Sequence, residues 1–144
     1  MDAAAFAVLY AQVQQFYARQ MQLFDAGDAP RWAQTFTADA VFDVPTLPAP
    51  VTGRAGLAAS LTAAAGAASR CGVRLRHVVS MLDVAARGDG LVDVRCYALV
   101  YATRVGGAPR VHRVCVCEDV LVAAPGGGLL VVRRRVRRDD LAAG

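Results

Sequence analysis

The chain has 144 residues, of which 56% are hydrophobic, and a formal net charge of +4. This length suffices for one hydrophobic core, so we expect a single domain over residues 1–144. No segment approaches the roughly 20 uninterrupted apolar residues of a membrane span, and the N-terminus lacks the basic start of a secretory signal. We therefore expect a cytoplasmic protein with no membrane contact.

Arginine supplies all of the basic side chains, since the sequence contains no lysine. Much of this charge lies in residues 133–138, directly before Asp139 and Asp140. Such a run can indicate a nucleic-acid surface, but no aromatic residues are interleaved with it to stack on bases. Arginines that keep a final edge strand soluble explain it equally well. We predict an edge strand here and no nucleic-acid partner.

The first half of the sequence reads as helical. Apolar residues at helical spacing over residues 6–24 predict one long helix, and Gly27 can take the left-handed conformation that ends it. Asp28 is placed to cap a short second helix that has a proline in its first turn. A short strand is predicted over residues 40–44, and an alanine-rich third helix over residues 53–69.

After residue 72 the apolar spacing changes from helical to alternating. Four strands are predicted, separated by glycine-rich turns, over residues 73–86, 91–104, 110–123 and 129–138. Helices followed by an antiparallel meander indicate an α+β fold. We predict a cone-shaped α+β barrel, in which three N-terminal helices pack in the concave face of a curved antiparallel sheet. The space between the layers is a natural small-molecule pocket.

Asp25 and His77 are the strongest candidates for chemistry. Alternation along residues 73–81 makes His77 the one polar residue on an apolar face, so it points into the core or the cavity. A neutral imidazole can exchange a proton near neutral pH, and Asp25 at the helix end could orient it. The same residues could instead be a helix stop and a hydrogen-bonded core histidine, and both interpretations remain open.

Other candidates follow from the same chemistry. Tyr17 and Tyr101 are phenols that could donate a hydrogen bond to a substrate oxygen. The expected pocket wall consists of Trp32, Phe36, Phe42, Met81, Tyr97 and His112. Cys115 and Cys117 share one face of a predicted strand and lack the spacing of a zinc site, so we expect small buried residues and no metal. No nucleotide-binding motif is present, which favours a pocket without a cofactor.

The order of several short motifs resembles the nuclear-transport-factor-2-like superfamily, and within it the SnoaL-like group. The matching segments are Leu23–Asp28 followed by Trp32, then residues 36–43, Gly53–Arg54, Arg76–Ser80, Glu118–Leu121 and Arg133–Asp139. The similarity covers nearly the whole chain. It is more specific for the fold than for an activity, because one fold hosts many functions.

The resemblance implies two classes of function. Relatives include dehydratases, ketosteroid-isomerase-like enzymes and polyketide cyclases; in the dehydratases an aspartate and a histidine at the positions of Asp25 and His77 form the working pair. A second histidine found in one branch is replaced here by Tyr101 and Ala102. The closing half also resembles the small subunit of aromatic-ring-hydroxylating dioxygenases, which is largely structural.

From these observations we expect a cofactor-independent dehydratase, isomerase or cyclase that acts on an apolar polyketide-like or polycyclic molecule. We expect it to form a homodimer or homotrimer through the outer face of the sheet. The alternative is a non-catalytic dioxygenase small subunit or a ligand-binding relative. The hydrogen-bond distance between Asp25 and His77, and a cavity beside them, would distinguish these classes.

Overall fold

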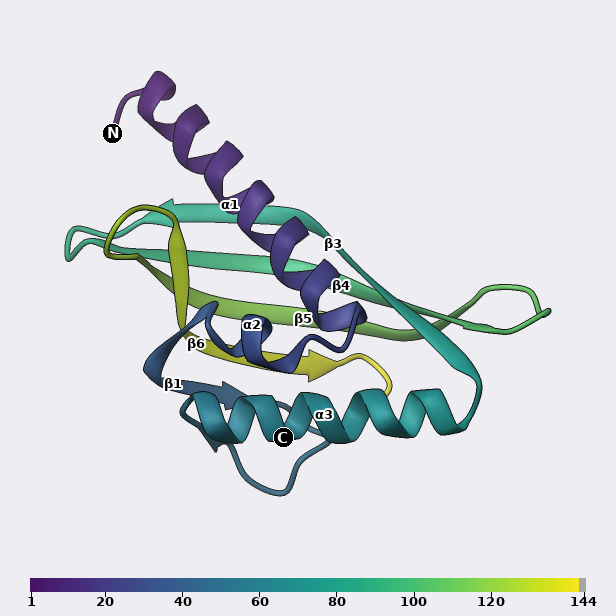
Figure 1. Ribbon diagram of the computed structural model, residues 1–144. Helices are drawn as coiled ribbons and strands as arrows, with labels where there is room; N and C mark the ends of the chain where they lie inside the picture. Colours follow the sequence, from purple (N-terminus) through teal and green to yellow (C-terminus); the bar gives the residue numbers. More distant parts are fainter. Residues whose placement is uncertain (143–144) are drawn as a thin grey trace.

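The computed structural model describes residues 1–142, and its elements follow the predicted order (Figure 1). The three helices are α1 (Ala3–Asp25), α2 (Ala29–Ala33) and α3 (Arg54–Arg70). The strands are β1 (Phe36–Asp43), β2 (Val51–Thr52), β3 (Val73–Ala86), β4 (Leu91–Arg104), β5 (Arg110–Ala123) and β6 (Leu129–Arg138). The four long strands therefore have the predicted bounds.

All six strands form one curved sheet in the order β2-β1-β6-β5-β4-β3. Neighbours pair antiparallel except β1 and β6, which are parallel. The prediction that the arginine-rich strand lies at an edge is wrong, because β6 lies between β1 and β5. The long edge strand is β3, and its free side faces the helices.

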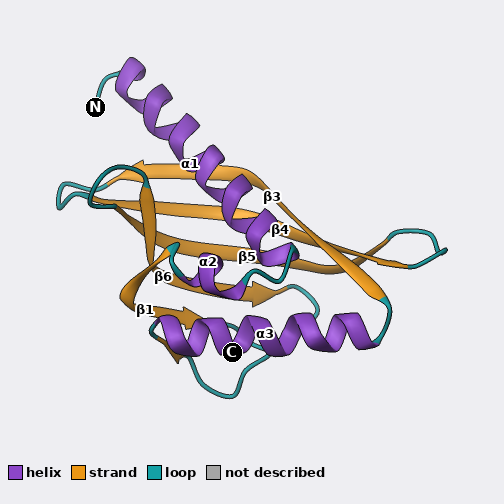
Figure 2. Ribbon diagram, in the orientation of Figure 1, coloured by secondary structure: helices purple, strands orange, loops and turns teal. Residues whose placement is uncertain are grey.

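The helices cover one face of this sheet. Helix α1 crosses the long strands diagonally, α3 runs along β1, and the short α2 lies between them (Figures 1 and 2). Contacts of α1 with β3, and of α3 with both β1 and β3, join the two layers. The predicted α+β fold, with helices in the concave face of a curved sheet, is confirmed.

The end of α1 is fixed by its own backbone. Gly27 has φ +69°, and its N–H donates to the carbonyl of Phe24, while the N–H of Asp28 donates to the carbonyl of Leu23. These two bonds form a Schellman motif, which satisfies carbonyls that a helix end otherwise leaves free. Asp28 also accepts the N–H of Arg31, so it caps α2 as predicted. Asp25 is consequently held at the last turn of a firmly terminated helix.

Three register shifts between the long strands change which side chains face the helices; in the one between β5 and β6, Val120 pairs with Arg133 but Leu121 pairs with Val131. The β3–β4 register shifts between Ser80 and Asp83, where Met81 has φ +56°. The β4–β5 register shifts where Val100 pairs with Arg113 but Tyr101 pairs with Val111, so His112 is the extra residue. A bulge breaks the strict alternation of faces, so positions that simple alternation assigns near these points are displaced.

The outer face of the sheet carries exposed apolar side chains at its β3–β5 end, namely Val78, Tyr97, Val111 and Val114. Self-association through this face stays a prediction. Among residues 1–142, no helix combines the length and apolar character needed to cross a bilayer.

The turn after α1 generates a stability prediction. A Cβ at Gly27 would lie 3.3 Å from the Cβ of Ala65 on α3, and the positive φ disfavours any L side chain. Gly27→Ala should therefore lower the free energy of unfolding by about 1–2 kcal/mol, measured by urea denaturation. Gly88→Ala is the matched control, because its Cβ would meet no atom within 4 Å. Equal stability of the two variants would contradict this account.

Candidate active site

Asp25 and His77 are in direct contact, although 52 positions separate them in the sequence. One carboxylate oxygen, Oδ1, lies 2.6 Å from the ring nitrogen Nδ1 of His77. The other oxygen, Oδ2, accepts the backbone N–H of the same residue at 2.9 Å. The carboxylate thus binds both the side chain and the main chain of His77.

The position of β3 explains why the main-chain bond exists. His77 pairs with Val100 of β4, but within residues 1–142 no strand lies on the other side of β3. Its N–H points outward from the sheet, where a buried amide needs an acceptor. Asp25 at the end of α1 supplies that acceptor, so the last turn of the helix is fastened to the edge of the sheet.

The ring contact determines which nitrogen of His77 can act as a base. An ionised carboxylate only accepts hydrogen bonds, so Nδ1 carries the proton that Asp25 accepts. In the neutral imidazole this leaves the lone pair on Nε2. The Asp25 side chain is 8% exposed and that of His77 is 17% exposed, so the pair is mostly shielded but reachable.

A cavity of about 380 Å³ opens beside this pair. It lies between the end of α1, the C-terminal half of α3 and the start of β3. Its lining includes Asp25, His77 and Phe24, together with small residues of the helices and turns: Ala26, Gly27, Ala64, Ala65, Ser69 and Gly72. The alanine-rich face of α3 therefore makes room here for a ligand.

Aromatic rings form the core behind the pair. The ring of Phe24 lies edge-on to His77, with centroids 4.7 Å apart, and edge-on to Trp32 at 5.0 Å. Phe36 and Phe42 pack against Trp32 in turn. Trp32, Phe36 and Phe42, expected in the pocket wall, form the core next to Phe24 and do not line the cavity. The indole N–H of Trp32 is buried and has no hydrogen-bond partner within residues 1–142.

A network of polar side chains is buried deeper in the cone, and an ion pair lies at its centre. Arg134 of β6 contacts Asp119 of β5 through Nε and Nη2, the shortest distance being 2.7 Å. Arg134 Nη2 also donates to Gln20 Oε1 at 2.6 Å, and the Tyr17 hydroxyl donates to Asp119 Oδ2 at 2.6 Å. The other end of the Gln20 amide, Nε2, donates a hydrogen bond to the hydroxyl of Thr35. Each charge is thus paired and hydrogen-bonded, as buried charges require.

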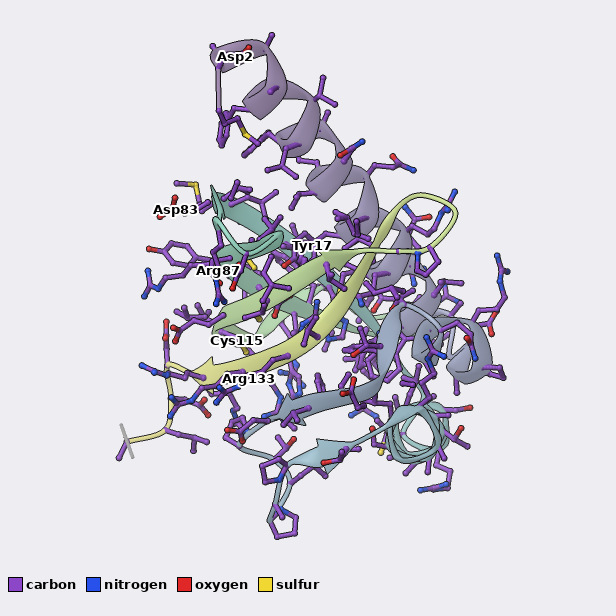
Figure 3. All side chains as sticks on the ribbon, turned by 90° about the vertical axis from the view of Figure 1, so that its left-hand side faces the viewer. Asp2, Tyr17, Asp83, Arg87, Cys115 and Arg133 are labelled. Atoms are coloured by element: carbon purple, nitrogen blue, oxygen red, sulfur yellow. The ribbon has the colours of Figure 1, made fainter. Side chains whose placement is uncertain are left out.

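This network removes Tyr17 from the expected donor role. Burial, and then the negative charge of Asp119, raise the pKa of Tyr17 well above its usual value. Its proton is already committed to the Asp119 carboxylate, and Tyr17 does not line the cavity. In Figure 3 Tyr17 lies where α1 meets the sheet.

Four further residues expected in the site lie elsewhere. Tyr97 and Tyr101 are on the outer face of β4, because the inner face is taken by the alternate residues such as Val100. Met81 is 71% exposed at its bulge. His112 is exposed at the bulge between β4 and β5, where its own partial burial and the charges of neighbouring arginines lower its pKa. The structure therefore brings Asp25 and His77 together without the predicted phenols.

Sequence reasoning missed the buried network, although one signal was present. Gln20 continues the stripe of buried residues Val13 and Tyr17 on α1, at a position where an apolar residue is expected. A polar residue in such a stripe indicates a buried partner. The sequence gave no sign that Arg134 is buried, because it stands in a run of arginines. The other arginines of this run point to the outer face of the sheet or lie at its rim.

The inner face of β5 carries Cys115 and Cys117, both buried, so the expectation that they share a face is correct. Burial raises the pKa of Cys115 to about 11. In the described part of the chain, no group of three or more His, Cys, Asp or Glu side chains is arranged to bind a metal ion.

Comparison with known proteins gives a family and several similar structures. The model of the SnoaL-like domain matches residues 7–135. A Catenulispora acidiphila protein solved in complex with S-DNPA is 38% identical, with 93% of this chain and 96% of that chain covered and a TM-score of 0.81. ActVI-ORFA from Streptomyces coelicolor is 30% identical over 95% and 99% of the two chains, with a TM-score of 0.88. Aln2 from a Streptomyces species is 38% identical over 92% and 91%, with a TM-score of 0.84.

A more distant likeness concerns the fold alone. The beta subunit of a putative aromatic-ring-hydroxylating dioxygenase from Novosphingobium aromaticivorans is 19% identical over 97% of this chain and 95% of that chain, with a TM-score of 0.75. No curated protein matches the chain.

The buried ion pair generates a prediction about stability. Arg134→Met removes one partner and leaves the Asp119 carboxylate buried without its counter-charge. We expect the free energy of unfolding to fall by about 3–5 kcal/mol, measured by chemical denaturation. Arg87→Met is the control, because Arg87 pairs with Asp89 at the surface and such pairs contribute about 0–1 kcal/mol. A loss in Arg134→Met no larger than in the control would contradict the structural role of the pair.

Proposed function

This chain belongs to the SnoaL-like family, and from that premise we propose that it is a cofactor-independent acid–base enzyme. The reaction begins with removal of a proton from carbon beside a carbonyl group. Dehydration, isomerisation or cyclisation of a polyketide-like molecule can follow from that step. The observation that carries the proposal is the 2.6 Å contact between Asp25 and His77 beside a cavity.

In this proposal His77 Nε2 is the base. The carboxylate of Asp25 holds the proton on Nδ1 and stabilises the imidazolium that forms when Nε2 takes the substrate proton. Its second bond, to the main chain of His77, prevents the carboxylate from rotating away. In dehydration the same proton is then returned to the departing hydroxyl group, so the enzyme ends in its starting state.

The enolate oxygen that develops needs a hydrogen-bond donor. Neither Tyr17 nor Tyr101 lines the cavity, and the buried N–H of Trp32 is excluded for the same reason. Within the cavity lining, Ser69 and Arg74 carry the polar side chains that could fill this role.

The expected ligand is small and apolar. The cavity of about 380 Å³ suits a molecule of a few fused rings, and alanine, glycine, leucine and valine make up most of its lining. A relative that is 38% identical was solved in complex with S-DNPA. The family premise and the cavity together favour a polyketide-like substrate.

The alternative is a protein that binds or assembles without catalysis. The likeness to the dioxygenase beta subunit is at 19% identity and concerns the fold alone. A satisfied core histidine needs no cavity beside it, whereas His77 borders one. This favours the enzyme over the assembly subunit.

Proton abstraction can be measured before the substrate is known. We expect the protein to accelerate exchange of the α-protons of the bicyclic aromatic ketone 2-tetralone in deuterated water, followed by proton NMR. His77→Gln should lower the enzyme-dependent rate by roughly 10²–10⁴-fold, because it removes the base. His112→Gln is the control, since it deletes the exposed histidine, and it should leave the rate unchanged. Equal rates in the two variants would exclude His77 as the base.

Asp25→Asn tests the orienting role separately. The amide oxygen can keep the bond from the main chain of His77, but the amide NH₂ then faces Nδ1 and donates to it. This favours the tautomer with the proton on Nε2, which is no longer a base. Nitrogen NMR of the ring should show the tautomer change, together with slower exchange. An unchanged tautomer with normal exchange would remove Asp25 from the mechanism.

A further inference from the structure

The two middle strands of the long meander, β4 and β5, are apolar on the face that points away from the helices. An apolar stripe on this face consists of three cross-strand pairs: Tyr97 with Val116, Leu99 with Val114, and Tyr101 with Val111. The inward positions between them are apolar too, among them the buried Cys115 and Cys117. A strand with water on one face normally alternates apolar and polar residues, and apolar residues on both faces are typical of strands that are covered on both sides. β4 and β5 therefore have the pattern of strands that a second layer covers.

The strands on either side of the apolar stripe carry charges on the same face. β6 presents Arg133, Arg135 and Arg137 outward, because the buried Arg134 between them points inward. On the other side, β3 presents Asp83, which projects from the sheet opposite to α2 and α3 in Figure 3. An apolar centre with a polar rim is the usual composition of a protein–protein interface.

One row of this face alternates in charge across the four long strands. From β3 to β6 its members are Asp83, Arg95, Glu118 and Arg135. Arg95 is exposed and has a carboxylate opposite it on both neighbouring strands, yet it makes no ion pair within residues 1–142. The same four residues border a hollow of about 450 Å³ in the outer face, which gives a long side chain of another molecule room to enter. The charge of Arg95 is thus available to a partner.

This face is complementary to a second copy of itself when a two-fold axis runs between β4 and β5, parallel to the strands. Each strand of the pair then faces the other strand of the second copy. Arg95 of one copy lies opposite Glu118 of the other, and the contact occurs twice, as in any isologous interface. The apolar pairs of the stripe meet in the same way, with Leu99 of one copy opposite Val114 of the other.

Other positions of the axis fit less well. An axis along the middle of β4 would set Arg95 against its own copy, and an axis along β5 would do the same to Glu118. An axis between β5 and β6 would set the valines of β5 against arginines, since Val116 pairs with Arg137 across those strands. An axis between β3 and β4 would leave the valines of β5 uncovered. Charge and apolar surface agree only on the axis between β4 and β5.

We propose that two copies of this chain pack face to face through β4 and β5, with the two-fold axis between these strands and reciprocal ion pairs between Arg95 and Glu118. The sheet of each copy is then covered by helices on one face and by a second sheet on the other, as in aligned sheet packing. The sequence led us to expect association through this face but gave no register for it. The inference is independent of the proposed function, because His77 and its cavity lie on the opposite face.

The test reverses one charge in each of two variants and then mixes them. In Arg95→Glu both contacts oppose two carboxylates, and in Glu118→Arg both oppose two guanidinium groups. Each variant alone should therefore dimerise at least roughly tenfold more weakly than wild type. In an equimolar mixture both contacts of a heterodimer join opposite charges again, so the mixture should recover the dimer. Light scattering during size-exclusion chromatography gives the mass, which for wild type should be twice the 15.1 kDa of one chain.

Arg19→Glu is the matched control, because it reverses the same charge on an exposed position of α1, and it should leave the dimer intact. Val114→Lys tests the apolar stripe without touching the charged row. Val114 is 39% exposed in the single chain, so lysine should be accommodated there but should disrupt the dimer. Circular dichroism checks the fold of each variant, and Val114→Lys keeps the proposal testable if a charge reversal does not fold.

Four results would overturn the proposal. Wild type could have the mass of one chain or of three, which excludes a two-fold pair. Either charge reversal alone, or Val114→Lys, could dimerise as tightly as wild type. The mixture of Arg95→Glu and Glu118→Arg could stay as weakly associated as its components, which would place the axis elsewhere. Arg19→Glu could weaken the dimer as much as Arg95→Glu, which would make the effect one of net charge.

Discussion

The ion pair between Asp119 and Arg134 is the interaction on which the rest of this structure depends. Two charges inside a hydrophobic cone need a counter-charge and hydrogen-bond partners, and α1 supplies two of these partners through Tyr17 and Gln20. These residues and Phe24 recur along one face of the helix. The rotation of α1 about its axis is thereby fixed, and so is the place where its last turn meets the sheet.

Asp25 shows that a structural and a chemical role need not compete. Its Oδ2 accepts the backbone N–H of His77 on the free side of the edge strand β3, where no strand of residues 1–142 pairs with it. With Oδ2 held by this bond, Oδ1 lies against the imidazole of His77. The helix stop that sequence alone suggests is therefore also the group that sets the histidine tautomer.

The sequence predicted the helices, the long strands and the inward direction of His77, because periodicity and turn residues are local signals. It could not assign the faces of β4, where Tyr97 and Tyr101 alternate with residues that are also apolar. Nor could it locate the bulge at Met81, since nothing in the composition requires a left-handed residue there. The central position of β6 depends on a parallel pairing with β1, which joins segments nearly a hundred positions apart.

The lining of the cavity has a thermodynamic consequence. Several of its contacts come from Ala26, Gly27, Ala64, Ala65 and Gly72, which have no rotatable side-chain torsions to lose. A rigid, flat ligand that binds against these residues costs almost no side-chain conformational entropy in them. The usual entropic penalty of about 0.5–1.5 kcal/mol for each immobilised long side chain is largely absent. Along this part of the wall, affinity is accordingly governed by shape, because alanine and glycine cannot change rotamer to accommodate a ligand of a different thickness.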